Sequence, residues 1–148
     1  MSPPDSIDPD QIALGVQQPW AELIVRGLKT LEIRRINTLR RERILIYASK
    51  KFSKYPAAEE MLKRHQLDRE ELVYGKLVGS VEIVGSRLST SEDVAAACVP
   101  KELIAGNHAW ELAFPEQFQK SLDVRFLPYG VWFYPFKRKQ DSRKKRDS

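Results

Sequence analysis

The segment 27–34 constrains the fold more than any other part of the sequence, because the period of the apolar residues changes within it. Before this segment, apolar side chains recur at the spacing of one helix face, at Trp20, Leu23 and Ile24. Gly27 follows at a position where helix ends often need a positive φ. The next residues alternate between apolar and polar, as a half-buried strand requires. The sequence therefore predicts a short helix, a turn at Gly27 and a strand.

The predicted strand has one apolar and one charged face. Leu31 and Ile33 point toward a core, whereas Glu32 and Arg34 share the opposite face. Lys29 lies at the entrance of the strand, close to the end of the helix. Three such charges can form a solvated ion-pair cluster, which contributes little stability. They can also form a polar site that binds an anion or polarises a carbonyl group, and the spacing alone leaves both interpretations open.

The spacing Gly-x-Lys-x-x-Glu-x-Arg, met by Gly27, Lys29, Glu32 and Arg34, resembles the signature of the ASCH domain family. The resemblance extends to flanking segments, which are residues 18–21, 46–50, 75–85 and 108–136. It implies an α+β fold, namely a small PUA-like β-barrel with peripheral helices and a cleft near the signature. It also implies a role with RNA or modified nucleosides, although a fold does not fix one activity.

The length of 148 residues fits one domain. We expect disordered segments at 1–10 and 137–148, because both are polar and carry little that could build a core, and an ASCH domain at 11–136. Within it, strands are expected over residues 12–17, 30–35, 43–49, 76–87, 108–114, 122–127 and 131–136. Helices are expected after Pro19, over 56–66, and over 91–98 with Ser91 as its N-terminal cap.

The net charge of +5 lies entirely in the segment 137–148, which holds seven basic and two acidic side chains. The neutral remainder is uneven, because residues 26–54 hold ten basic side chains and two acidic ones. Such a patch favours an anionic partner. No apolar run approaches the ~20 residues of a membrane span, and the N-terminus lacks the pattern of a signal peptide. A single cysteine, Cys98, makes an intrachain disulfide impossible. We expect a cytoplasmic protein, monomeric by default.

The main hypothesis is a module that binds RNA or another single-stranded nucleic acid, or a modified nucleoside, in the cleft. Lysine and arginine side chains contact phosphates or base edges, and tryptophan rings stack on bases. The candidate binding residues are Lys29, Glu32, Arg34, Ser49, Lys50, Trp20 and Trp110.

A second hypothesis is an enzyme in the same cleft, either an amidohydrolase of an N4-acetylcytidine-type nucleoside or a ribonuclease. The family resemblance implies that Lys29 and Glu82 correspond to catalytic residues of the amidohydrolases. Those enzymes carry threonine where this chain has Glu32, which departs from their pattern. A third hypothesis is a protein-interaction adaptor that uses the basic tail. No histidine, cysteine and carboxylate set has metal-binding spacing, so we expect no metal and no cofactor.

Overall fold

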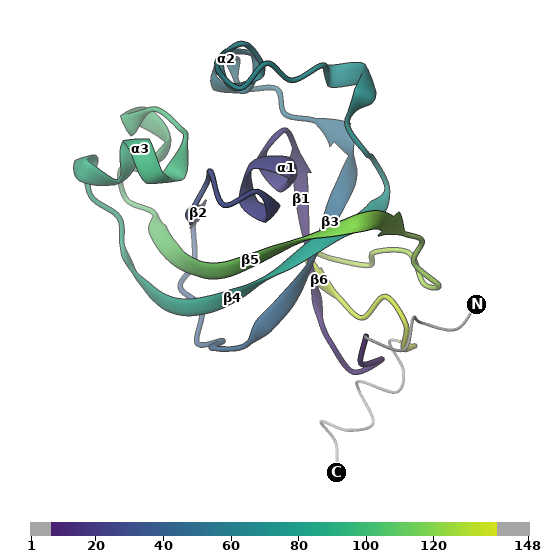
Figure 1. Cartoon of the computed structure of the whole chain (residues 1–148). Helices are drawn as coiled ribbons and strands as arrows, with labels where there is room; N and C mark the ends of the chain where they lie inside the picture. The colour runs from purple at the N-terminus through teal and green to yellow at the C-terminus, as the bar shows by residue number, and fades with distance from the viewer. Residues whose placement is uncertain (1–6, 139–148) are drawn as a thin grey trace.

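The computed structural model describes residues 7–138 (Figure 1). Within that range, six strands form one mixed sheet in the order β2-β5-β4-β3-β1-β6. The strands are β1 (Ala13–Gln18), β2 (Leu31–Arg34), β3 (Arg43–Phe52), β4 (Lys76–Leu88), β5 (His108–Leu122) and β6 (Trp132–Phe133). The helices are α1 (Trp20–Val25), α2 (Pro56–Arg64) and α3 (Val94–Ala97). Short 3-10 turns are η1 (Arg69–Glu71), η2 (Ser91–Asp93) and η3 (Lys101–Leu103).

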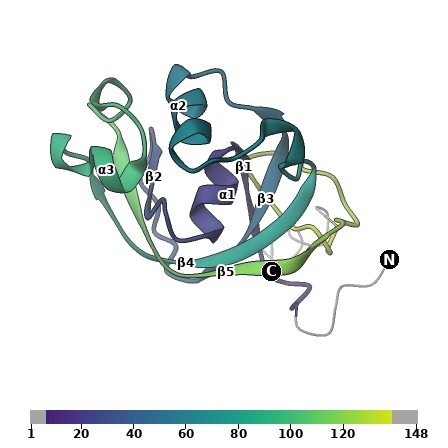
Figure 2. The same ribbon diagram turned by 45° about the horizontal axis from the view of Figure 1, so that its top comes forward.

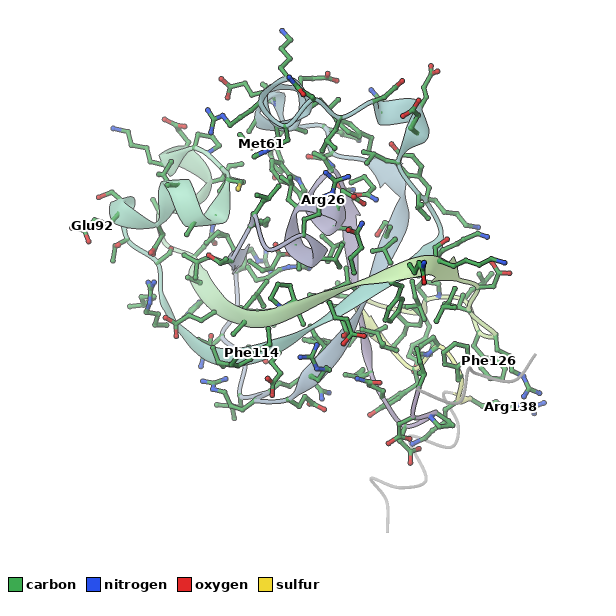
Figure 3. All side chains as sticks on the ribbon, in the orientation of Figure 1. Arg26, Met61, Glu92, Phe114, Phe126 and Arg138 are labelled. Atoms are coloured by element: carbon green, nitrogen blue, oxygen red, sulfur yellow. The ribbon has the colours of Figure 1, made fainter. Side chains whose placement is uncertain are left out.

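The sheet curls into a half-barrel around α1, which Figure 2 shows enclosed by the strands. Strand β1 pairs in parallel with β3, and the other pairs are antiparallel. All six residues of α1 are buried in this concave face. Helix α2 covers the open side, where Met61 points toward α1 (Figure 3) and is 4% exposed. The α+β barrel-like architecture predicted from the sequence is confirmed.

The segment 27–34 folds as predicted. Gly27 has a φ of +78°, and the backbone N–H groups of Leu28 and Lys29 both donate to the carbonyl of Leu23, at 2.9 and 3.0 Å. This turn ends α1 and starts β2. Leu31 is buried in a small apolar cluster beside α3, and Ile33 packs against that cluster. The helix-to-strand change in period is therefore correctly located.

Strand β4 departs from the single apolar face that a period of two predicts. Leu77 packs in one apolar cluster, whereas Val78, Val81 and Ile83 pack in the main core. The register against β3 shifts at this point: Ile46 pairs with Gly79 and the next residue of β3 pairs with Leu77. The extra residue is a β-bulge, which moves the following side chains to the other face.

The last predicted strands need correction. The strand expected over 108–114 continues to Leu122, and the strand expected over 131–136 is reduced to Trp132–Phe133. No strand forms over 123–127, because the N–H groups of Arg125 and Phe126 both donate to the carbonyl of Pro135 in a turn rather than to a ladder. The helix expected over 91–98 is a 3-10 turn followed by α3, and its cap is Thr90 rather than Ser91.

The described fold extends beyond both predicted domain boundaries. Ile7 is buried in a cluster with Phe133, and the Lys137 ammonium lies 3.0 Å from the Asp10 carboxylate. Residues 7–10 and 137–138 are therefore placed against the domain. The remainder of the two segments predicted to be disordered, 1–6 and 139–148, lies outside the described residues.

Candidate nucleic-acid interface

A cavity of about 490 Å³ lies where the signature meets the start of α1 and the segment around η3. Lys29, Glu32 and Arg34 all line it, together with Trp20. These four were predicted from the sequence to share a site, and the fold brings them together. The other walls come from distant parts of the chain, including Gly15, Arg35, Tyr55, Val99, Glu102, Leu103 and Asn107.

Lys29 is 3% exposed, although it carries an ammonium group. Its Nζ donates to the carbonyl of Ala97 at the end of α3, and it lies 3.7 Å from Oε1 of Glu32. The same nitrogen lies 5.3 Å from the centre of the Trp20 ring. Burial lowers the pKa of Lys29, and the nearby Glu32 carboxylate opposes that shift. The Lys29 ammonium is thus almost shielded from solvent. One of its N–H groups donates to the Ala97 carbonyl, and its other N–H groups can donate to further acceptors.

Glu32 and Arg34 interact mainly with each other. Oε2 of Glu32 accepts a hydrogen bond from Nε of Arg34 at 2.8 Å and lies 2.7 Å from Nη2. Nη2 also donates to the carbonyl of Gly15 at 3.2 Å. Because β1 and β2 are not neighbours in the sheet, this contact links two strands across the open side of the half-barrel. The predicted bidentate phosphate contact by Arg34 would have to replace these bonds.

The Arg34 guanidinium lies against a buried tryptophan ring, Trp110. Its guanidinium lies 5.7 Å from the centre of the Trp110 ring, which stacks on Trp132 at 5.8 Å and an interplanar angle of 13°. The indole N–H of Trp110 donates to the carbonyl of Ile36, and the residue is 1% exposed. The structure therefore corrects the prediction that Trp110 stacks on a base, because its ring faces are already covered by Arg34 and Trp132.

Three other predicted residues do not line the cavity. Ser49 and Lys50 lie near the end of β3, where Lys50 is exposed. Glu82 lies on β4 between Val81 and Ile83, two residues of the main core, so its side chain points to the opposite, outer face. The structure thus separates Glu82 from Lys29, and the carboxylate nearest to Lys29 belongs to Glu32.

Sequence reasoning missed Arg35, Tyr55, Glu102 and Asn107 as cavity residues. Arg35 lies next to the signature and within the basic segment, so charge alone could have included it. Tyr55 is 52% exposed just before α2, and no local pattern links it to the signature. Glu102 and Asn107 are far from the signature in sequence, and only the tertiary fold brings them to it.

The basic segment 26–54 is partly neutralised by ion pairs. Arg26, Arg34 and Arg40 pair with Glu22, Glu32 and Glu42, respectively. Within residues 7–138, no ion pair is formed by Arg35, Lys50, Lys51 or Lys54. Arg35 is the member of this group that lines the cavity, so it is the cation most available to a ligand there.

Residues 7–138, the part of the chain that the structure describes, contain neither a metal-binding cluster nor a membrane-spanning helix. Among those residues, no group of three or more histidine, cysteine, aspartate or glutamate side chains could hold a metal ion. The same residues include no helix of the length and apolarity needed to cross a bilayer.

Comparison with known proteins identifies the family. The ASCH domain model matches residues 14–121. The ASCH protein of Zymomonas mobilis has a similar crystal structure, with a TM-score of 0.57 and 17% identity over 95% of this chain and 96% of that one. A tyrosine-to-phenylalanine variant of that protein gives a TM-score of 0.55 at 15% identity, covering 93% and 96% of the two chains. A search of curated proteins found no match. At this identity the structural likeness establishes the fold alone.

Proposed function

Because this chain belongs to the ASCH domain family, we propose that it binds single-stranded RNA or a modified nucleotide in the cavity beside Lys29. The observation that carries the proposal is a buried lysine, 3% exposed, that lines the cavity together with exposed Arg35, which forms no ion pair within residues 7–138. The cavity volume of about 490 Å³ lies in the range of small-molecule sites. One buried and one exposed cation in the cavity wall suit a ligand with a polar base and a phosphate.

Each group has a distinct role in this proposal. Lys29 donates to an acceptor on the base, since one of its three N–H donors is held by Ala97. Arg35 contacts the phosphate. Tyr55 offers an exposed ring on which a base can stack. Arg34 acts indirectly, because its bonds to Glu32 fix the carboxylate that faces Lys29.

A second candidate function is hydrolysis of an N4-acetylcytidine-type nucleoside or of RNA in the same cavity. The observation that favours it is the lowered pKa of Lys29, since a less basic amine is a better general base near neutral pH. In this geometry Glu32 is the carboxylate placed beside Lys29. Glu82 points to the outer face of the sheet, so it does not complete the pair.

The test measures the affinity of the full chain for a fluorescently labelled single-stranded RNA by anisotropy. Losing one charge-assisted hydrogen bond costs about 1.5–3 kcal/mol, so Lys29→Ala should weaken binding roughly tenfold to a hundredfold. Arg35→Ala should also weaken binding. The matched control is Lys120→Ala, which removes an exposed lysine of β5 outside the cavity and should leave affinity nearly unchanged.

Two results would contradict the proposal. Equal affinities for the wild type, Lys29→Ala and Lys120→Ala would show that the cavity does not bind the RNA. Turnover of acetylated cytidine by the wild type, lost in Lys29→Ala and in Glu32→Gln, would make hydrolysis the better description. Thermal unfolding of each variant must accompany the assays, because Lys29 is buried.

A further inference from the structure

The loop that joins β2 to β3 starts in the wall of the cavity. Its first residue, Arg35, lines the cavity, and four residues later Leu39 is 88% exposed. Ile36 is 65% exposed on the same loop. Isolated exposed apolar residues are ordinary on protein surfaces. The feature that distinguishes the 35–41 loop is that its backbone is fixed although its apolar side chains are presented to solvent.

Hydrogen bonds to the rest of the domain hold the loop. The carbonyl of Ile36 accepts from the Trp110 indole at 3.0 Å. Thr38 is 8% exposed, and its N–H donates to the Ser86 hydroxyl at 3.3 Å. Within the loop, the Thr38 carbonyl also accepts from Nη1 of Arg41 at 3.0 Å. A loop held in this way loses little conformational entropy when a partner binds.

Two arginines, Arg40 and Arg41, directly follow the exposed Leu39 in the loop. The Arg40 guanidinium lies 4.8 Å from the centre of the Trp132 ring and pairs with Glu42 at 2.7 Å. Arg41 is exposed, and within residues 7–138 its guanidinium donates only from Nη1, to backbone carbonyls, which leaves its other donors for a partner. The loop therefore presents an aliphatic tip beside cationic groups.

We propose that Leu39 is a wedge that inserts between two adjacent bases of the single strand that leaves the cavity, with Arg35 and Arg41 on the neighbouring phosphates. This inference rests on the proposed function. Leucine is among the apolar side chains that minor-groove proteins insert between base steps of DNA, which partly unstacks them, and stacked bases of a single strand offer the same kind of step. Four residues span at most about 14 Å, so Leu39 lies within that distance of Arg35 and meets the strand within a few nucleotides of the phosphate that Arg35 holds.

The charged and apolar side chains of the loop favour a nucleic acid as its binding partner. A strand of nucleic acid combines an anionic backbone with flat apolar base faces, which match the arginines and the leucine. An anionic membrane surface also combines charge with apolar groups. The position of Arg35 favours the nucleic acid, because the same residue lines the cavity and begins the loop.

The experiment uses single-stranded RNAs that carry 2-aminopurine at successive positions, with anisotropy and emission measured on the full chain. Binding of the wild-type protein should increase the 2-aminopurine emission at one position of the RNA, because the base at that position is unstacked. Leu39→Ser should abolish the rise and weaken affinity about fivefold or more, with an unchanged salt slope because leucine carries no charge. The matched control Leu127→Ser replaces a leucine that is 65% exposed elsewhere and should change neither signal.

The possible outcomes separate this inference from the proposed function. If Lys29→Ala weakens binding but Leu39→Ser alters neither emission nor affinity, the wedge is wrong and the cavity proposal stands. If neither substitution matters, or the wild type does not bind RNA, both fail. If Leu39→Ser instead abolishes cosedimentation with phosphatidylserine vesicles and leaves RNA binding intact, the loop is a membrane contact and the wedge is overturned.

Discussion

Replacing Glu32 by glutamine would remove one buried negative charge that faces two cations. Glu32 is 7% exposed, and its carboxylate contacts Arg34 at 2.7 and 2.8 Å and Lys29 at 3.7 Å. Breaking a buried ion pair by removing one partner typically costs 3–5 kcal/mol, because a buried charge is left uncompensated. Since the Arg34 side chain is 23% exposed and keeps some hydration, we expect a loss of about 3 kcal/mol in the free energy of unfolding. Urea denaturation monitored by tryptophan fluorescence measures it.

The control is Glu42→Gln, which breaks an ion pair of the same 2.7 Å length whose partners are also two residues apart in the sequence. The Arg40 and Glu42 side chains are 35% and 46% exposed, and exposed pairs contribute about 0–1 kcal/mol. The two variants thus differ chiefly in burial. Equal losses of stability in Glu32→Gln and Glu42→Gln would refute the reasoning that the Glu32 cluster is a buried, interdependent unit.

Two other predictions concern Lys29 and Gly79. Because burial lowers the pKa of Lys29 below its usual 10.5, the unfolded chain binds more protons between the lowered pKa and 10.5. Wild-type stability relative to Lys29→Met should therefore rise with pH in that window, by at most about 1.4 kcal/mol per pH unit; a constant difference in urea denaturation from pH 7 to 10 would contradict this. Gly79→Ala should lower stability by about 1–3 kcal/mol or more, because an added Cβ would overlap the Glu116 carbonyl and lie 2.6 Å from Val25 Cγ1. Gly130→Ala, whose Cβ would meet its nearest atom at an ordinary 3.6 Å, should be close to neutral when both variants are compared with the wild type by urea denaturation.

The signature was predictable from sequence because its geometry is local. A helix end, a positive-φ glycine and a strand of period two fix the relative positions of residues 27–34 within a few ångströms. Lys29 and Glu32 therefore come together without help from distant parts of the chain. The α+β fold followed from the same change of period and from the family resemblance.

The residues that surround β2 were not predictable from sequence, because they depend on which other elements of the fold cover each of its two faces. The apolar face of β2 packs against α3, whereas the charged face points into the half-barrel, where Glu32 pairs in register with Trp110. A sequence pattern places Glu32 and Arg34 on one face but does not say that this face is interior. The bulges of β4 and the burial of Trp110 are likewise consequences of long-range pairing.

The two interpretations of the charged segment are compatible in the structure. Glu32 and Arg34 satisfy each other, and Arg34 also ties β2 to the carbonyl of Gly15 on β1. These bonds hold the cavity wall in place and keep the Glu32 carboxylate oriented toward Lys29. The groups left for a ligand are therefore Lys29 in the wall and Arg35 at the start of the next loop. In this arrangement the ion pairs allow Lys29 to be buried and still donate hydrogen bonds to a ligand. Arg34→Ala should therefore reduce both the free energy of unfolding and RNA affinity. Arg35→Ala should reduce RNA affinity alone.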